Sequence, residues 1–415
     1  MTKIDFQQLY YQDPYLRELE VTVTACEPAA SADGTEQYNL CFNKTVFYPE
    51  GGGQPGDRGR IYRTDSRDKV LAEITDTRYD SRNRIVHQAT AALPVGSTVR
   101  TVIDWDRRYE LMQQHSAEHL VSGLIKQRYG FENVGFHINE TFTTLDTSGY
   151  LPPEDLAWLT DEMNRIIWNN LPFETTVYPA EEVRDLDYRS KIDLPDDVRL
   201  VQVEGVDLCA CAGTHVHTTG ELGQVRFIDH QKHRGGVRLT MLAGVRALRD
   251  AESLHTQALE AGSALAAPRL ELLPSLTKLQ EQLNSSLMAN RRLTSRLLSL
   301  ALPKRIEAPT LCIVPAGLDA KDIKYQVKGL EPADGAQVLL LQPDGPQTRF
   351  FLRAGTKEGQ QTVLSFLKDE YEAKGGGPPQ LSQGALTMPT DASGDPDTEA
   401  VKQAFEAQGW QVVEA

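Results

Sequence analysis

The sequence has few cysteines and no long apolar run. Its 415 residues include only five cysteines, scattered along the chain, so a disulfide framework is not expected. No stretch approaches the ~20 apolar residues that cross a bilayer, and the N-terminal MTKIDFQQLYYQDPY lacks the apolar core of a secretory signal. We therefore expect a cytoplasmic protein without membrane contact, in a compartment where thiolates can hold metal.

An excess of positive charge is also missing. Lys and Arg number 43 against 58 Asp and Glu, which gives a net charge of −15. A protein held mainly by phosphates would carry a basic balance, so any nucleic-acid contact must be local. The basic stretch 226–249 offers Arg234 and Arg238 as candidates, although a solvated basic face explains the stretch equally well.

The first half of the chain changes from strand-like to helical patterns. Residues 1–105 contain short β-branched and aromatic runs broken by Gly, Pro and Asp, which predicts a small β-barrel. Residues 106–245 open with a helical stripe over 107–129 and a second helix over 153–170, followed by strands. This segment is typical of an α+β domain, and we assign the whole chain to the α+β class.

The second half contains a leucine-rich arm and a further domain. Leucines recur at helical spacing in residues 246–304, with breaks expected at Pro268 and Pro274, which predicts two antiparallel helices in a hairpin. The apolar stripe of such an arm needs a partner surface, either its own first helix or another subunit. Residues 305–415 predict a small α/β domain, so a homodimer through the arm and this domain is one expectation.

Two pairs of potential metal ligands stand out. HSAEH places His115 and His119 on one helix face, about 6 Å apart at their Cβ atoms. Glu118 makes the same string fit H-x-x-E-H, the inverted zincin signature. Cys211 and His215 in CAGTH form a second pair. Three imidazoles and one thiolate are a tetrahedral donor set of the kind that Zn²⁺ takes, so we predict one Zn²⁺ per chain.

A glycine-rich stretch, YPEGGGQPGDRG, contains Gly51, Gly52 and Gly53. Such glycines leave backbone N–H groups bare, and these can receive a phosphate or a carboxylate. A simple turn between two strands accounts for the same composition. The residues alone favour the turn, without excluding contact with an anion.

Together these motifs resemble one known family. HSAEHL, CAGTHVHTTGELG and RGGVRLTMLAG look like the editing domain of alanyl-tRNA synthetase and its free-standing relatives, the AlaX alanyl-tRNA editing proteins. TVFYPEGGGQPGDRGRI matches the family's F-Y-P-E-G-G-G-Q element, and the arm with GGGPPQLSQG resembles long-form members, whose tail is similar to the synthetase's C-terminal domain. Because the chain begins at the predicted barrel, the resemblance implies an enzyme acting in trans.

The sequence departs from the family pattern at two places. The family's C-G-G-T-H is C-A-G-T-H here, and Ala212 is tolerable if its φ stays negative. Pro378 and Pro379 interrupt the glycine run of the tail, so the role of that loop in relatives transfers less safely.

The resemblance implies hydrolysis of the ester in tRNA(Ala) mischarged with serine, with the glycyl ester as a second candidate substrate. A site built to hydrogen-bond the serine hydroxyl discriminates more strongly than the ~1–3 kcal/mol available from a methyl group. His137 is one candidate selector, although a strand histidine with a satisfied hydrogen bond is an alternative. The remaining candidates are Thr45, Gln54 and Gly51–Gly53 for the substrate, and Arg234 and Arg238 for tRNA.

The role of the zinc and the class of protein both have alternatives. Four protein ligands describe a closed, structural site, whereas a catalytic zinc keeps one position open; no general base is identified. A zinc peptidase would use Glu118 as base and Glu181 or Glu182 as a ligand, which leaves C-x-x-x-H unexplained. A non-catalytic, zinc-stabilised tRNA-binding protein is the third hypothesis.

Overall fold

The computed structural model shows a mixed α+β protein with a closed six-stranded barrel and, over the residues described, eight α-helices. This confirms the predicted class. The description covers residues 5–415 apart from 30–33, 66–68, 180, 185, 191–196, 345–346 and 392. Two compact units, Met1–Leu259 and Glu260–Ala415, are described separately. Within the described part, none of the helices combines the length and apolar character that a membrane span requires.

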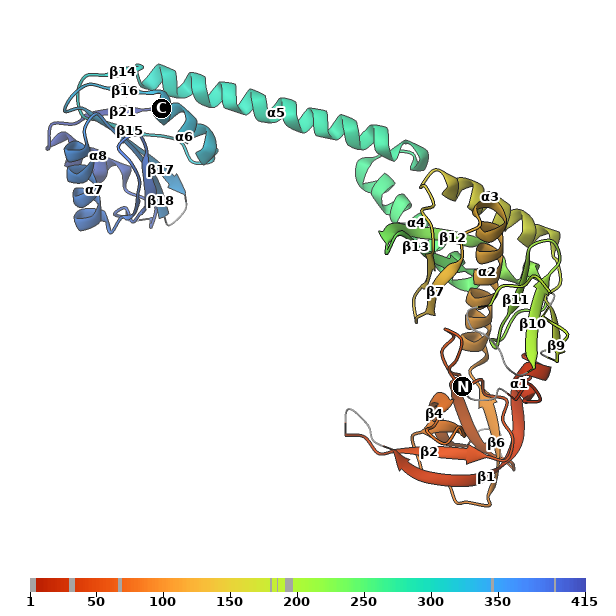
Figure 1. Cartoon of the computed structure of the whole chain (residues 1–415). Helices are drawn as coiled ribbons and strands as arrows, with labels where there is room; N and C mark the ends of the chain where they lie inside the picture. Colours follow the sequence, from red (N-terminus) through yellow and green to blue (C-terminus); the bar gives the residue numbers. More distant parts are fainter. Residues whose placement is uncertain are drawn as a thin grey trace. The chain divides into compact units, whose positions relative to one another are not determined.

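The predicted barrel is confirmed, and several of its strands are labelled in Figure 1. It closes in the order β1-β2-β5-β4-β3-β6. Alternating residues such as Val21, Val23 and Leu40 point inward and are at most 2% exposed, because successive side chains of a strand face opposite sides. A short helix, α1 (Leu9–Gln12), precedes it. The strands are β1 (Glu18–Ala29), β2 (Gln37–Phe42), β3 (Gly59–Arg63), β4 (Val70–Tyr79), β5 (Ile85–Ala89) and β6 (Thr98–Ile103).

Helix α2 (Trp105–Tyr129) follows the barrel directly and confirms the first predicted helix. Its N-terminus is capped by the Asp104 side chain, which accepts from the Arg107 N–H, and it ends at Gly130 with φ 70°. Every residue from Leu111 to Ile125 is buried, because the helix packs against strands and helices on several sides.

Two antiparallel sheets pack near α2 and complete the first unit. The four-stranded sheet has the order β12-β13-β8-β7, and the three-stranded sheet the order β11-β10-β9. The second predicted helix is confirmed as α3 (Asp155–Asn169). The strands are β7 (Asn133–Ile138), β8 (Thr143–Thr147), β9 (Glu174–Tyr178), β10 (Val198–Val203), β11 (Asp207–Ala210), β12 (Val225–His233) and β13 (Gly236–Ala243), with a 3₁₀ turn η1 (Thr219–Leu222).

The leucine-rich segment forms α4 (Gly244–Leu265), a 3₁₀ turn η2 (Arg269–Glu271) and α5 (Leu272–Ala301). The break expected at Pro274 was wrong: this residue stands in the first turn of α5, where a missing N–H costs no hydrogen bond within the helix. The interruption lies earlier, at Ala266 with φ 48° and at Pro268.

The second unit contains a six-stranded mixed sheet of order β19-β20-β18-β17-β15-β21 and a small parallel pair, β14-β16. Helices α6 and α7 contact strands of this sheet (Figure 1). The helices are α6 (Ala320–Gly329), α7 (Lys357–Tyr371) and α8 (Thr398–Glu406). The strands are β14 (Arg305–Ile306), β15 (Thr310–Ile313), β16 (Glu331–Pro332), β17 (Gln337–Asp344), β18 (Gln347–Ala354), β19 (Lys374–Gly376), β20 (Ser382–Leu386) and β21 (Gln411–Glu414).

Candidate metal centre

The two predicted ligand pairs come together in the structure. His115 and His119 project from α2, while Cys211 and His215 lie in the loop after β11. One potential ligand atom from each residue falls within 4.8 Å of all the others. The Cys211 Sγ lies 3.4 Å from the His115 Nε2 and 3.4 Å from the His215 Nε2. Residues separated by nearly a hundred positions therefore form one possible metal site.

These distances suit a four-coordinate ion. A tetrahedral ion with metal–sulfur and metal–nitrogen bonds of about 2.3 and 2.0–2.1 Å separates a sulfur from a nitrogen ligand by about 3.6 Å. Both observed sulfur–nitrogen distances are close to this value. The donor set of three imidazoles and one thiolate fits Zn²⁺ in chemistry as well as in spacing.

The hydrogen bonds of Gln54 determine which nitrogen of His115 carries the proton. The Thr214 N–H donates to the Gln54 Oε1 at 3.1 Å, and the Gln54 Nε2 donates to the Thr214 Oγ1 at 2.8 Å. The Oε1 therefore also accepts from the His115 Nδ1, 2.9 Å away. With its proton on Nδ1, His115 presents the Nε2 lone pair to the centre.

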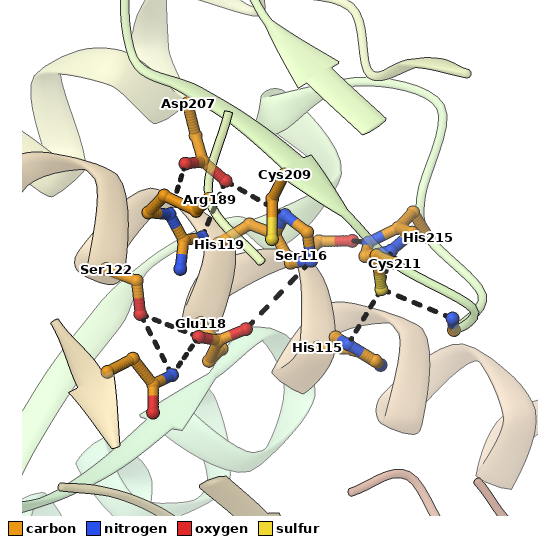
Figure 2. A network of polar contacts seen from close by, with 12 residues as sticks. His115, Ser116, Glu118, His119, Ser122, Arg189, Asp207, Cys209, Cys211 and His215 are labelled. Carbon is orange, nitrogen blue, oxygen red and sulfur yellow. Dashed lines mark hydrogen bonds and ion pairs between the residues drawn. The ribbon is translucent and has the colours of Figure 1, made fainter. Parts of the chain in front are cut away.

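The other two imidazoles are held in the same way (Figure 2). The His119 Nδ1 lies 3.0 Å from the Asp207 Oδ2, and the Arg189 guanidinium donates to both oxygens of that carboxylate at 2.6 and 2.8 Å. The His215 Nδ1 lies 3.2 Å from the Ser116 Oγ. Partners of this type fix ring orientation and raise ligand basicity at metal sites, so all three histidines are prepared to bind through Nε2.

The loop that carries Cys211 is held by hydrogen bonds from an arginine side chain to its backbone carbonyls. The Arg199 Nη1 donates to the carbonyls of Cys211 and Gly213 at 2.8 and 3.1 Å. A Cβ on Gly213 would lie 2.1 Å from the His115 Cε1, so only glycine allows this approach. Ala212, the departure from the family motif, is not among the residues with positive φ, and the condition for tolerating its methyl group is met.

The electrostatics of the centre favour a bound cation. Burial raises the pKa of the Cys211 thiol, but the neighbouring imidazoles outweigh burial and hold it well below its usual value. Burial lowers the pKa of His215 to about 3, which keeps this ring neutral. Burial also lowers the pKa of His119, yet Cys211 and Asp207 raise it to about 10. A proton on His119 thus balances the thiolate, and a metal ion would replace that proton.

Glu118 lies beside the centre without belonging to the four-residue group. Its Oε2 is 4.0 Å from the His119 Nε2, and its Oε1 accepts from the Ser122 hydroxyl at 2.6 Å and from the Asn133 amide (Figure 2). The peptidase interpretation requires a further carboxylate ligand, but the side chains proposed for it, Glu181 and Glu182, are exposed. A thiolate, Cys211, stands with the histidines instead.

The glycine-rich stretch forms a tight turn that reaches the centre. Gly51 and Gln54 are bridged by backbone hydrogen bonds, and Gly52 and Gly53 have φ 58° and 82°. A Cβ on Gly53 would lie 2.6 Å from the Phe136 ring, so the turn approaches β7 closely. The turn interpretation is confirmed, and the turn also delivers Gln54 to His115.

Thr45 and His137, the other substrate candidates, lie elsewhere. Thr45 is buried in the barrel, where its hydroxyl lies 2.8 Å from the His87 Nε2. His137 is exposed in β7, and strand alternation places it opposite its neighbour Phe136. The Phe136 ring lies 5.1 Å from the His115 ring, so Phe136 is the β7 side chain that meets the centre.

The basic stretch 226–249 is largely neutralised. Arg238 donates to both oxygens of Asp146 at 2.6 and 2.7 Å, and Glu110 pairs with Arg246 and Arg249. Arg234 is exposed at the β12–β13 turn, with φ 45°. Of the two predicted tRNA contacts, Arg234 is therefore the one at an exposed turn.

The motifs did not identify several residues that support the centre: Ser116, Arg189, Arg199, Asp207 and Gly213. Ser116 and Gly213 lie inside the ligand motifs HSAEH and CAGTH. Their place in these motifs could have indicated that they support the ligands. Arg189 and Arg199 are remote in sequence, and only the pairing of β10 with β11 brings Arg199 beside Cys211.

Two family models of aminoacyl-tRNA synthetases match parts of this chain. Residues 5–107 match the family model "tRNA synthetases class II (A)", and residues 198–239 match "Threonyl and Alanyl tRNA synthetase second additional domain". The first match covers the barrel and its glycine turn, and the second contains Cys211 and His215. The chain is thus similar to domains of class II aminoacyl-tRNA synthetases.

The individual relatives are alanyl-tRNA editing proteins and alanine–tRNA ligases. The chain is 29% identical to the alanyl-tRNA editing protein AlaX-L of Pyrococcus horikoshii over 58% of its length and 59% of the relative. It is 27% identical to the alanyl-tRNA editing protein Aarsd1 of Mus musculus over 91% of its length and 94% of the relative. An alanine–tRNA ligase of Methanoregula boonei matches 91% of the chain at 26% identity, over 41% of the ligase.

The matches thus span less than two thirds of the archaeal editing protein and of the ligase. Together they confirm the resemblance to alanyl-tRNA editing proteins that the motifs indicated.

Proposed function

We propose that this chain is a trans-acting editing hydrolase that deacylates tRNA(Ala) mischarged with serine, with the glycyl ester as a second substrate. The observation that carries the proposal is the cluster of three imidazoles and one thiolate in which every imidazole has its Nδ1 engaged. The similarity to alanyl-tRNA editing proteins supplies the substrate class. We propose the cytoplasm as its location, because such a substrate is present there.

His115, His119, Cys211 and His215 are the proposed ligands of one Zn²⁺. A zinc ion held there would supply Lewis-acid chemistry toward an ester carbonyl or a water molecule. The chain's own residues set the geometry: Gln54, Ser116 and Asp207 orient the imidazoles. These residues position ligands and do not themselves react with the ester.

The proposal also names the residues that would select the substrate. Gln54 uses both amide atoms on His115 and Thr214, so we assign it to positioning rather than selection. Thr45, His137 and the turn Gly51–Gly53 remain the proposed substrate residues, and Arg234 and Arg238 the proposed tRNA contacts. Thr45→Val and His137→Ala should lower the ratio of seryl to alanyl ester hydrolysis if they recognise the hydroxyl.

The proposal divides the chain into four working segments. The barrel with its glycine turn occupies residues 1–105, the metal-binding editing domain 106–245, the helical arm 246–304 and the C-terminal domain 305–415. The barrel's last strand ends at Ile103 and α2 begins at Trp105, which supports the first of these boundaries.

The test combines metal content with ester hydrolysis. Purified protein should contain one zinc per chain and should hydrolyse the seryl ester of tRNA(Ala) fastest and the alanyl ester slowest. Cys211→Ala should lose the metal, whereas Cys209→Ala, a buried thiol in the neighbouring strand, should keep it.

Each alternative has its own outcome. Zinc retained by Cys211→Ala would favour the peptidase hypothesis. A zinc-loaded protein that binds tRNA but hydrolyses none of the three esters would leave only the binding role. Hydrolysis of the correctly charged alanyl ester as fast as that of the seryl ester would exclude a proofreading role.

A further inference from the structure

Aromatic rings stack in a run that begins just after the candidate metal ligands. The His217 imidazole lies nearly flat on the Tyr15 ring, with centroids 3.9 Å apart and planes at 17°. Tyr15 contacts the Trp105 ring at 5.2 Å, and Trp105 stacks on Tyr109 at 5.5 Å and 30°. The Arg17 guanidinium covers the Trp105 ring at 4.0 Å. These four rings, the aromatic run, extend from the loop that carries the candidate ligands to the start of α2.

One carboxylate holds three members of the aromatic run in place. The Tyr15 hydroxyl donates to the Glu221 Oε2 at 2.5 Å, and the Tyr109 hydroxyl donates to the same oxygen at 3.0 Å. The Glu221 Oε1 accepts from the His217 N–H at 2.9 Å. Both hydroxyl protons are thus engaged within the protein, and the run offers a ligand mainly flat ring surface. Because the rings are fixed in advance, binding costs less conformational entropy.

His217 is the exposed end of the aromatic run. The Tyr15 ring covers one face of its imidazole, so a ligand can approach the other face. Only the buried Val216 separates His217 from the candidate ligand His215, and two residues of chain span at most about 7 Å. A planar group on the outer face of His217 therefore lies close to the candidate metal centre.

We propose that the outer face of His217 stacks a base of the unpaired 3′ end of the tRNA, with the rest of the aromatic run as its support. The inference rests on the proposed function and assigns a surface to the end of the RNA that carries the ester. Every nucleobase has a π-face, so stacking binds single-stranded RNA without a strict sequence requirement. A base held beside His215 brings its ribose, and an ester on that ribose, toward the proposed zinc ligands.

The charge of the protein makes stacking the better source of affinity. With a net charge of −15, the chain as a whole repels a phosphate backbone. A groove of about 800 Å³ beside Trp105 is lined by three arginines and three acidic residues, so it carries no excess of positive charge. Arg17 adds one cation at the far end of the run. Contact with the faces of bases does not depend on the sign of the protein's charge.

A purely structural role is the alternative for this run. Tyr15, Trp105 and Tyr109 are partly buried and pack against the cores of the first unit, so packing alone explains them. His217 differs because it is exposed. A structural role predicts that loss of the His217 ring changes the affinity for any RNA equally, whether or not its 3′ end is present.

The test compares tRNA(Ala) with and without its unpaired 3′-terminal nucleotides. Both RNAs are uncharged and labelled at the 5′ end, so that fluorescence anisotropy gives the Kd for the full chain without hydrolysis. The wild-type protein should bind the intact RNA more tightly than the shortened one. His217→Ala should lower this ratio of affinities about 10-fold, within the range that one stacked base contributes. His217→Phe keeps a flat ring and should retain the wild-type ratio.

Two controls separate stacking from damage to the metal centre. His217→Ala and His217→Phe should keep the wild-type zinc content, because neither changes a proposed ligand. Trp168→Ala removes a ring that is 77% exposed on α3, outside the aromatic run, and should leave the ratio unchanged. With the seryl ester as substrate, His217→Ala should raise KM and leave kcat unchanged, since stacking is lost equally from the ground state and the transition state.

The outcomes distinguish this proposal from the proposed function. An unchanged ratio in His217→Ala would overturn the stacking surface. So would an equal loss in His217→Phe, or loss of zinc from His217→Ala, because the ring would then act through the metal centre. A protein that shows the ratio dependent on His217 but hydrolyses none of the esters would keep the stacking surface and overturn the editing function. Hydrolysis of the seryl ester without that ratio would do the reverse.

Discussion

Helices α2 and α5 have 25 and 30 residues and differ in how much of their surface is buried. Helix α2 buries Gln113, Gln114 and the two candidate histidine ligands, while α5 exposes leucines such as Leu283 and Leu293. Burial is therefore decided by the surroundings of a helix and not by its average polarity. Helix α2 can be buried because its glutamines and histidines have hydrogen-bond partners, whereas α5 leaves many of its leucines exposed.

The glutamines of α2 show how such burial is sustained. The Gln114 amide donates to the Ala243 carbonyl at 2.9 Å and accepts from the Ala243 N–H at 3.0 Å. Gln113 similarly connects to Glu221 and Val245. Buried polar groups rigidify a fold when they are fully bonded and destabilise it when one bond is missing. These bonds fix α2, the helix that carries two of the candidate ligands.

The largest expected effect is loss of the charge pair beneath α2. The Arg108 Nε lies 2.9 Å from the Asp57 Oδ1, and both side chains are at most 1% exposed. Asp57→Ala should lower the free energy of unfolding of the first unit by about 3–5 kcal/mol, because a buried guanidinium loses its counter-charge. Urea denaturation measures this change.

The matched control is the Arg291–Asp322 pair of α5, where the Arg291 side chain is 55% exposed. Arg291→Ala should cost less than about 1 kcal/mol. Equal losses of unfolding free energy in Asp57→Ala and Arg291→Ala would show that the burial of the charge pair does not matter.

Leucine truncation compares the two helices directly. Leu120 on α2 is fully buried, whereas Leu283 on α5 is 58% exposed. Leu120→Ala should cost about 2–5 kcal/mol through lost burial and the cavity left behind. Leu283→Ala should change the stability of the isolated subunit by less than about 0.5 kcal/mol. A loss for Leu283→Ala as large as that for Leu120→Ala would contradict the exposure of the Leu283 side chain.

The barrel contributes a buried polar group of a different kind, His87. Its Nδ1 lies 3.1 Å from the Leu40 carbonyl and its Nε2 2.8 Å from the Thr45 hydroxyl, and burial lowers its pKa to about 4. The unfolded chain takes up a proton near pH 6.5 while the folded chain does not. Stability should therefore fall by about 3 kcal/mol as the pH decreases from 6.5 to 4, and not further below that.

His87→Gln removes this titration and serves as the reference. Both proteins should carry Cys211→Ala, so that release of metal in acid does not contribute. Parallel stability curves for the two proteins between pH 6.5 and 4 would show that His87 is not the source of the change.

The smallest effect expected is on metal affinity. Gln54→Leu should weaken zinc binding about 10- to 100-fold, because the partner that orients His115 is lost while all four ligands remain. Competition with a chromophoric chelator measures the Kd. Gln88→Leu, a half-buried barrel glutamine in β5, is the control and should leave the Kd unchanged. An unaltered Kd in Gln54→Leu would show that the glycine turn does not support the centre.

Local patterns were sufficient for most of the elements and for the candidate ligands that the structure brings together. The periodicity of residues 107–129 predicted α2, and the spacing of His115 from His119 predicted a shared helix face. Pro274 misled because proline breaks a helix interior but is tolerated in a first turn. The orientation of Gln54 was also not predictable, since its partners, His115 and Thr214, lie 61 and 160 residues away.

The sequence by itself determined which residues can bind metal, because side-chain chemistry and helical spacing are local properties. It also determined the helical spacing of the leucines in α5, which is a matter of order along one helix. Only the tertiary structure decided which nitrogen of each histidine faces the centre and which helix is buried. Those choices depend on partners supplied by segments distant in sequence, and no local pattern encodes them.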